Sequence, residues 1–216
     1  MSKNKKVVAD LLFIIQIVCT IIFGGGQFVR MLATAQGVSM SWFIFWEIFL
    51  IINLILALKA HKNQPSRVTW QTIGSYTLWV IMVTADLGVM VWKGTGTWSK
   101  NDTITAIIAG TGILATLIIA MRNSNGINDP IAKGWLAVFF KATPQLMMAI
   151  KIMSVGAAGL AGTTVITGHI TVLTRLGQLA FSIKEAGWDR NRKGSAISEL
   201  ANEGSWVITT IAWLMN

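Results

Sequence analysis

Seven long apolar stretches, separated by short segments rich in charge, Pro, Gly and Asn, constrain this chain more than any other feature. A helix needs ~20 predominantly apolar residues to cross the roughly 30 Å of hydrocarbon in a bilayer. Each stretch meets that requirement, and we predict spans at residues 7–29, 40–58, 70–92, 103–121, 131–154, 163–183 and 197–215. The sequence therefore predicts an all-α membrane protein with seven transmembrane helices.

Composition and the placement of charge narrow the class of protein further. Only 12% of the residues are charged and 53% are hydrophobic, whereas soluble domains carry about 25% charged residues. The net charge is +9, but the cations lie at the ends of apolar stretches, where they orient spans, so we expect no nucleic-acid partner. The single Cys19 excludes an intramolecular disulfide and a cysteine metal cluster. The sequence has no HExxH, GxSxG or P-loop motif, so neither an enzyme nor a cofactor is predicted.

An internal repeat sets the expected organisation. Aligning Gln27 with Gln145 matches the first stretch to the fifth, and aligning Gly37 with Gly159 matches the second to the sixth. A shared Gly-Ser-aromatic tripeptide matches the third to the seventh, and the fourth stretch has no counterpart. Equivalent stretches enter the membrane from the same side, as in parallel transporter repeats. We therefore predict two parallel three-helix bundles, at residues 1–96 and 127–216, joined by a linker helix at residues 97–126.

The distribution of Lys and Arg predicts the orientation. Most of the 18 Lys and Arg residues lie on the N-terminal side of the predicted spans. On the other side lie Arg30, Lys93, Lys100 and Lys151. Cytoplasmic segments of membrane proteins carry the excess of Lys and Arg. We therefore predict a multi-pass protein of the plasma membrane, with its N-terminus in the cytoplasm and its C-terminus on the far side.

Polar and aromatic residues recur at helical spacing on one face of six of the seven stretches. Because lipid offers a polar side chain no partner, such faces turn toward protein or water. Interhelical hydrogen bonds account for part of this pattern, and a central cavity accounts for the rest. The predicted substrate-binding residues are Trp46, Asn53, Thr72, Tyr76, Trp79, Lys141, Gln145, Arg175, Asn202 and Trp206.

Charged residues within the apolar stretches are the more specific signal. At about 1.5 Å per residue, Lys141, Arg175 and Glu47 reach similar depths, so we expect them to meet. They form either a structural ion triad or a site with a surplus positive charge, which a solute carboxylate would neutralise. Asp86 is expected near the opposite face, within reach of water. Glu47, Asp86 and His169 are candidates for proton coupling, and the alternative for His169 is a hydrogen-bonded packing residue.

The order of residues around the first connection resembles a known motif. Gln27 is followed by the segment Gln36-Gly37-Val38-Ser39-Met40-Ser41, then by Trp46 and by Asn53-Leu54. This order resembles the PQ-loop motif of the PQ-loop and SWEET superfamily, and Thr143-Pro144-Gln145 supplies the literal Pro-Gln pair in the second half. The resemblance covers both triple-helix halves and leaves out the fourth helix.

The resemblance implies two bundles that enclose a central site and move against each other, with hinges at Gly26-Gln27 and Pro144-Gln145. In sugar-transporting members, an Asn of the third helix of each bundle and a nearby Trp contact the solute. Asn202 matches one such Asn, Thr72 replaces the other, and Trp46 matches the Trp. The chain departs from the family in four ways. The first hinge has no proline, one binding Asn is missing, Lys141 and Arg175 are unusual for a sugar site, and familiar eukaryotic members have the N-terminus outside.

Together these features predict a membrane transporter of a small polar solute, sugar-like by resemblance, that works by alternating access. An amino-acid or organic-acid carrier, with or without proton coupling, is the alternative within the same class. A non-transporting seven-helix receptor is the alternative from another class. The expected partners are a small-molecule solute and the lipid bilayer, and a homo-oligomer is left open.

Overall fold

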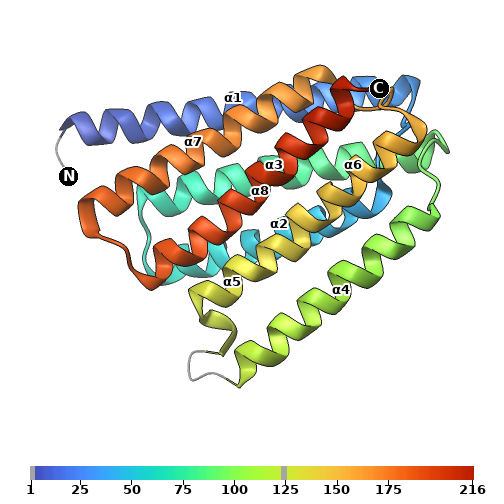
Figure 1. The fold of residues 1–216 in the computed structure, drawn as a ribbon. Coiled ribbons are helices and arrows are strands. Elements are labelled where there is room, and N and C mark those ends of the chain that lie inside the picture. Colours follow the sequence, from blue (N-terminus) through green and yellow to red (C-terminus); the bar gives the residue numbers. More distant parts are fainter. Residues whose placement is uncertain (1–2, 123–125) are drawn as a thin grey trace.

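The computed structural model describes residues 3–122 and 126–216, which form helices joined by short connections (Figure 1). The α5, η2 and α6 segments follow one another without a break, so they make a single long helix with a π-helical turn inside it. Seven long helices result, no strand occurs in these two ranges, and the predicted all-α architecture is confirmed. The elements are α1 (Lys3–Ala33), α2 (Met40–Asn63), α3 (Arg67–Trp92), α4 (Lys100–Met121), η1 (Gly126–Asn128), α5 (Pro130–Ala137), η2 (Val138–Ala142), α6 (Thr143–Val155), α7 (Gly162–Ala186) and α8 (Arg190–Leu214).

The helices pack as two halves of three with the same internal order. In the first half α3 packs against both α1 and α2, and in the second half α8 packs against both α7 and the α5–α6 helix. The halves meet where α1 packs on α7 and α2 packs on η2 and α6. The connecting helix α4 lies along the outside, against α5 and α6 (Figure 1). The two termini lie at opposite ends of the bundle, because the chain crosses the bundle an odd number of times in alternating directions.

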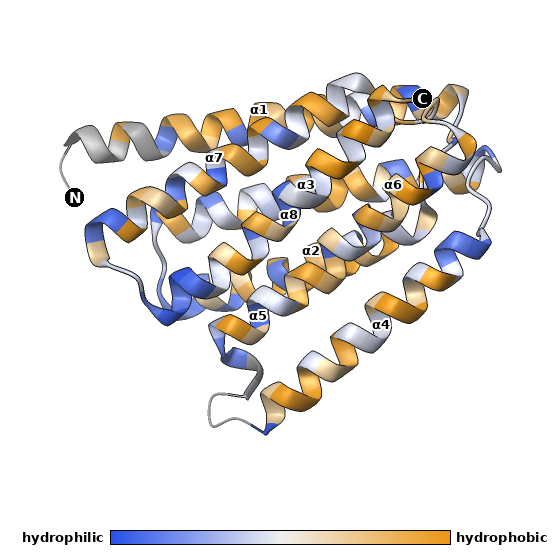
Figure 2. Cartoon of the chain, viewed as in Figure 1, coloured by the Kyte–Doolittle hydropathy of each residue, from blue (hydrophilic) through white to orange (hydrophobic). Residues whose placement is uncertain are grey.

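Within the described residues, five helical stretches are long and apolar enough to cross a membrane: Asp10–Ala33, Met40–Asn63, Arg67–Trp92, Lys100–Met121 and Pro130–Val155. The helices α7 and α8, with 25 residues each, are as long but more polar. Their polar residues, such as Thr164 and Thr209, are fully buried, whereas large apolar side chains such as Leu173 and Val207 are exposed. Apolar residues predominate along most of the helices (Figure 2), and many of the large apolar side chains are exposed. A hydropathy window averages both faces of these helices, which is why it separates them from the other five.

The π-helical turn in the second half follows from Pro144. Proline has no N–H group, and its ring clashes with the carbonyl four residues earlier, which here belongs to Phe140. The helical turn before Pro144 is therefore wider than an α-helical turn, and the N–H of Thr143 donates to the carbonyl of Val138, five residues earlier. Such π turns are rare and are frequent at functional sites. This one contains Lys141, the lysine predicted to lie in the membrane.

At the C-terminal end of the bundle, the connector at residues 34–39 lies against the connector at residues 156–161. Gln27 is fully buried there, and its Nε2 donates to the carbonyl of Gly159 at 2.8 Å. Its Oε1 accepts from the N–H of Ala161 at 3.1 Å. The N–H of Gly159 in turn donates to the carbonyl of Gln36 at 2.8 Å. The two halves are therefore joined, backbone to backbone, at this end.

A buried carboxylate fixes the linker helix to both halves at the same end. Asp102, in the first turn of α4, is fully buried. One of its oxygens accepts from the hydroxyls of Ser39, at 2.6 Å, and Ser41, at 2.8 Å, both at the start of α2. The other oxygen lies 3.4 Å from the ammonium of Lys151 in α6. This site was not predicted, because the residues that surround it come from three separate elements.

The close approach of the connectors gives a prediction for Gly159. A Cβ atom at this position would lie 2.5 Å from the backbone carbonyl carbon of Ala35, so one of the connectors must move. We expect Gly159→Ala to destabilise the purified protein by about 1–3 kcal/mol, the usual cost of overpacking. The measurement is thermal unfolding in detergent. Gly177→Ala is the control, since a Cβ there meets nothing within 4 Å, and equal melting temperatures for the two variants would contradict the connector packing.

Candidate solute-binding site

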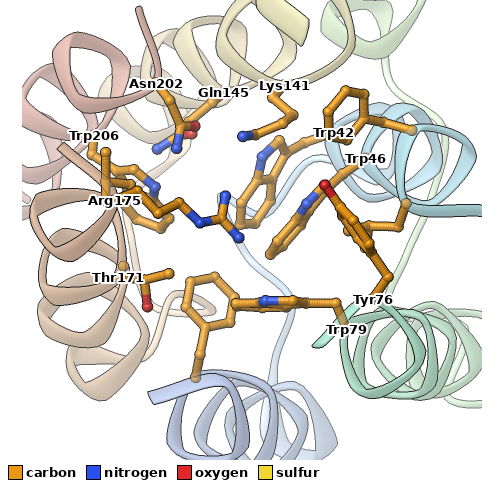
Figure 3. A pocket seen from close by; sticks show the side chains of 15 residues that line it. Trp42, Trp46, Tyr76, Trp79, Lys141, Gln145, Thr171, Arg175, Asn202 and Trp206 are labelled. Atoms are coloured by element: carbon orange, nitrogen blue, oxygen red, sulfur yellow. The ribbon is translucent and has the colours of Figure 1, made fainter. Parts of the chain in front are cut away.

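A pocket lies between the two halves, midway along the helices (Figure 3). Its volume of ≈ 40 Å³ corresponds to about three water molecules, at roughly 10–15 Å³ for each. A solute larger than a few atoms enters only if the halves move apart. The lining residues are Phe23, Trp42, Trp46, Phe49, Leu50, Tyr76, Trp79, Lys141, Gln145, Gly168, Thr171, Val172, Arg175, Asn202 and Trp206.

The wall from the first half is aromatic. The ring of Phe23 meets that of Trp46 edge-on at 5.4 Å and that of Trp79 at 5.1 Å. Trp46 and Trp79 are themselves 5.0 Å apart, and Trp42 stacks on Trp46 at 5.4 Å. Trp206, from the second half, completes the cluster at 6.1 Å from Trp42. Offset and edge-on contacts of this kind hold aromatic side chains in fixed orientations.

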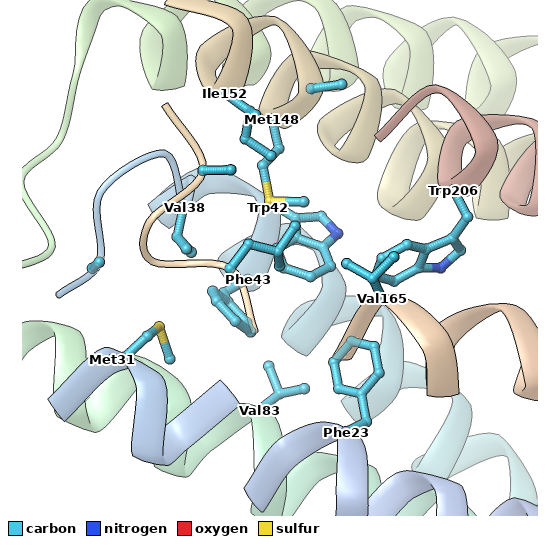
Figure 4. Packing of buried hydrophobic residues seen from close by; sticks show 14 of the residues in the cluster. Phe23, Met31, Val38, Trp42, Phe43, Val83, Met148, Ile152, Val165 and Trp206 are labelled. Carbon is cyan, nitrogen blue, oxygen red and sulfur yellow. The ribbon is translucent and has the colours of Figure 1, made fainter. Parts of the chain in front are cut away.

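On the side of this wall that faces the connectors at residues 34–39 and 156–161, an apolar core separates the pocket from those connectors (Figure 4). Phe43, Met31 and Met148 are fully buried in it, and it reaches Val38 in the first connector and Leu160 in the second. Tightly packed apolar side chains leave no path for a polar solute. In this structure the pocket is therefore closed toward the C-terminal end.

The polar wall comes from the second half, and two of its groups, on Gln145 and Lys141, have no hydrogen-bond partner in the described part of the chain. Gln145 is only 2% exposed, and its Nε2 has no hydrogen-bond partner among the described residues. Lys141 is 7% exposed, and its ammonium lies over the ring of Phe49, 5.3 Å from the ring centre. Both side chains, together with Asn202, point into the same central space (Figure 3). A buried donor without a partner costs about 1–3 kcal/mol, so this wall is suited to a ligand with acceptor groups.

Arg175 also lines the pocket, but its partner differs from the predicted one. Its guanidinium lies 4.0 Å from Glu199 of α8. Glu47 instead accepts a 2.7 Å hydrogen bond from Thr84 of α3 and is absent from the pocket lining, so the predicted meeting with Lys141 and Arg175 is wrong. The surplus positive charge is still present, because Glu199 neutralises one of the two cations. An uncompensated cation at mid-membrane depth costs about 2.5–3.5 kcal/mol on insertion scales.

Two predicted binding residues, Asn53 and Thr72, lie outside the pocket. Asn53 donates to the carbonyl of Phe49 at 2.7 Å, and Thr72 donates to that of Val68 at 2.9 Å. Each side chain is thus satisfied within its own helix. The other predicted binding residues all line the pocket: Trp46, Tyr76, Trp79, Lys141, Gln145, Arg175, Asn202 and Trp206.

Several lining residues were missing from the prediction. Trp42 lies one turn before Trp46, and helical spacing places both on the same face, but Trp42 was not among the predicted binding residues. Gly168 has a different role: a Cβ there would lie 2.9 Å from the ring of Trp206. The missing side chain makes room for this indole. No sequence pattern predicts that an indole packs against a glycine in this way, because the contact depends on how α7 and α8 face each other.

The predicted hinge residues lie at contacts between the halves. A Cβ at Gly26 would lie 2.2 Å from the hydroxyl oxygen of Thr163, so α1 and α7 cross closely there. Gln27 bonds to the second connector, as described above, while Pro144 follows the π turn and Gln145 faces the pocket. Movement at these positions stays a prediction.

The proton-coupling candidates do not come together. Asp86 is 1% exposed and neither of its oxygens has a hydrogen-bond partner among the residues that the structure describes, so the expectation that it reaches water is wrong. His169 contacts Glu203 at 2.6 Å through Nδ1 and Thr210 at 2.8 Å through Nε2. It therefore pairs with neither Glu47 nor Asp86. In the described ranges, no group of three or more His, Cys, Asp or Glu side chains is placed to hold a metal ion.

Comparison of the chain with protein-family models, with curated proteins and with solved structures finds no match. The functional inference therefore depends on the pocket itself. Its features are a central position between two similar halves, an aromatic wall, and a polar wall with unpartnered donors and a surplus positive charge.

The Arg175–Glu199 pair gives a second prediction. Glu199→Gln removes the carboxylate that neutralises Arg175 and leaves two cations without a carboxylate partner in one pocket. We expect the free energy of unfolding to fall by about 1–3 kcal/mol, and to recover in part when Arg175→Gln is added. Asp10→Asn is the control: its partner Arg67 is 66% exposed, so about 0–1 kcal/mol is expected. Thermal unfolding measures all of these, and a Glu199→Gln protein as stable as the parent would contradict the pairing.

Proposed function

We propose that this protein is a membrane carrier that moves a small polar solute by alternating access of its two three-helix halves. One observation carries the proposal: the pocket with unpartnered polar groups lies midway along the helices, at the boundary between the halves. Transporters built from repeats bind their substrates at such a position, near the midplane and at the repeat interface.

The way the pocket is closed supports a carrier over a permanent channel. At the C-terminal end the halves are joined by hydrogen bonds from Gln27 and by contacts between Gly37, Gly159 and the facing backbone. Water can replace each of these bonds when the connectors separate. Near the other end, Gln16 of α1 makes only a long 3.4 Å hydrogen bond to Gln178 of α7. We infer that the halves separate at the N-terminal end to admit the solute from that side, and at the connectors to admit it from the other side.

The resemblance to the PQ-loop and SWEET superfamily supports the same function and belongs to the proposal. Gln27 and the Pro144-Gln145 pair occupy equivalent positions of the two halves, at the places where the family has its hinges. The proposed location is the plasma membrane, with a cytoplasmic N-terminus, as the distribution of Lys and Arg predicts. The solute and the bilayer are then the partners of the chain.

Counterflow in proteoliposomes tests the proposal. Vesicles loaded with one unlabelled solute from a panel of sugars, amino acids and organic acids should take up the same labelled solute faster than vesicles without protein. Gln145→Ala removes a donor from the pocket, and we expect a loss of affinity of up to about tenfold for the exchanged solute. Gln64→Ala, at the exposed end of α2, is the control. Binding of a solute without any exchange would contradict a carrier and favour a receptor.

A further inference from the structure

We propose that the solute carries a single carboxylate group, which binds to Lys141 in the pocket, with an apolar or planar remainder against the tryptophans. The transport of that solute rests on the function proposed above, whereas its binding does not. The inference follows from the charges, from the donors that lack partners, and from the difference between the two walls.

The charges around the pocket leave one positive charge without a partner. Lys141 has no Asp or Glu oxygen within 4.0 Å in the part of the chain that the structure describes. Glu199 acts on it electrostatically from beyond that distance, and this carboxylate lies 4.0 Å from Arg175. No Asp or Glu is among the lining residues. A ligand with one negative charge would balance the site, and a ligand with two would exceed it.

The donors are arranged for an acceptor with two oxygens. Lys141 and Gln145 are four residues apart on the same helix and both line the pocket, so the ammonium and the amide belong to one face. The Nε2 of Gln145 is buried and has no hydrogen-bond partner within the described ranges, and the side-chain amide of Asn202 enters the same space (Figure 3). A carboxylate has two acceptor oxygens and forms strong hydrogen bonds with charged donors. It would satisfy Lys141 and Gln145 at the same time.

The opposite wall selects the rest of the molecule. Among the first-half residues that line the pocket, only Tyr76 has a hydroxyl group, and the others are Trp, Phe and Leu side chains. The ring faces of Trp46 and Trp79 offer a sugar hydroxyl no acceptor, and each indole has only one N–H donor, so hydroxyl groups placed there would lose more hydrogen bonds to water than they gain. An aliphatic or aromatic remainder loses nothing there and buries apolar surface.

The alternative is that Lys141 is a packing residue held by its contact with Phe49, 5.3 Å from the ammonium. In that case the pocket would show no preference for anions. Matched ligands of the same shape separate the two cases, because benzoate and benzamide differ in charge and in little else, as do propanoate and propanamide. D-glucose is the neutral polyhydroxylated probe.

Binding to the purified, full-length protein in detergent tests the assignment, with quenching of the pocket tryptophans as the signal. We expect benzoate to bind at least tenfold more tightly than benzamide, and propanoate more tightly than propanamide. Lys141→Met should abolish this preference, while Lys141→Arg, which keeps the charge, should retain it. Lys133→Met is the matched control, since Lys133 lies on the preceding helical segment and is exposed.

Each outcome decides one question. Equal affinities for acids and amides, tighter binding of D-glucose or of inorganic phosphate, or an unchanged preference in a folded Lys141→Met protein would each overturn the carboxylate assignment. A neutral solute exchanged in proteoliposomes would overturn it too, but would leave the carrier standing. Benzoate that binds through Lys141 yet is never exchanged would contradict the carrier and leave the binding site standing.

Discussion

Inside a membrane-spanning bundle a polar side chain finds partners only in the protein or in enclosed water, and the arrangement of this molecule depends on that constraint. The two repeat-equivalent glutamines meet it differently. Gln27 is buried with both ends of its amide bonded to the second connector, so it joins the halves. Gln145 is also buried, but its amide nitrogen faces the pocket and has no hydrogen-bond partner in the described part of the chain. Gln27 thus holds the two halves together at the connectors, whereas the equivalent Gln145 is free to bind a ligand.

The helical face of most site residues could be predicted from the sequence, because a period of 3.6 residues fixes which side chains share a face. Trp46, Tyr76 and Trp206 were identified in this way and do line the pocket. The same reasoning failed for Asn53 and Thr72, which bond to the carbonyl four residues earlier in their own helices. A polar residue on an inward face has that option in any helix, and spacing alone does not show which one takes it.

The sequence did not predict which charged side chains pair between helices, because these pairs depend on the depth and rotation of each helix. Glu199, three residues before Asn202 on α8, neutralises Arg175, whereas Glu47 points to Thr84 on another side of the first half. The 3+1+3 order was predicted from the repeat and is confirmed by the packing of α3 and α8 at the centre of each half. The carboxylate of Asp102, which holds the linker helix to both halves, had no signal in the repeat, since the linker has no counterpart.

The central claim is that one pocket is reached in turn from both sides of the membrane. Thr171 lines that pocket and is 5% exposed, and the chain has a single cysteine, Cys19, which can be replaced by alanine. A membrane-impermeant thiol reagent applied to Cys19→Ala/Thr171→Cys protein, in right-side-out and in inverted vesicles, measures access from each side. The account predicts labelling from both sides. Labelling from one side only, with and without solutes, would contradict it.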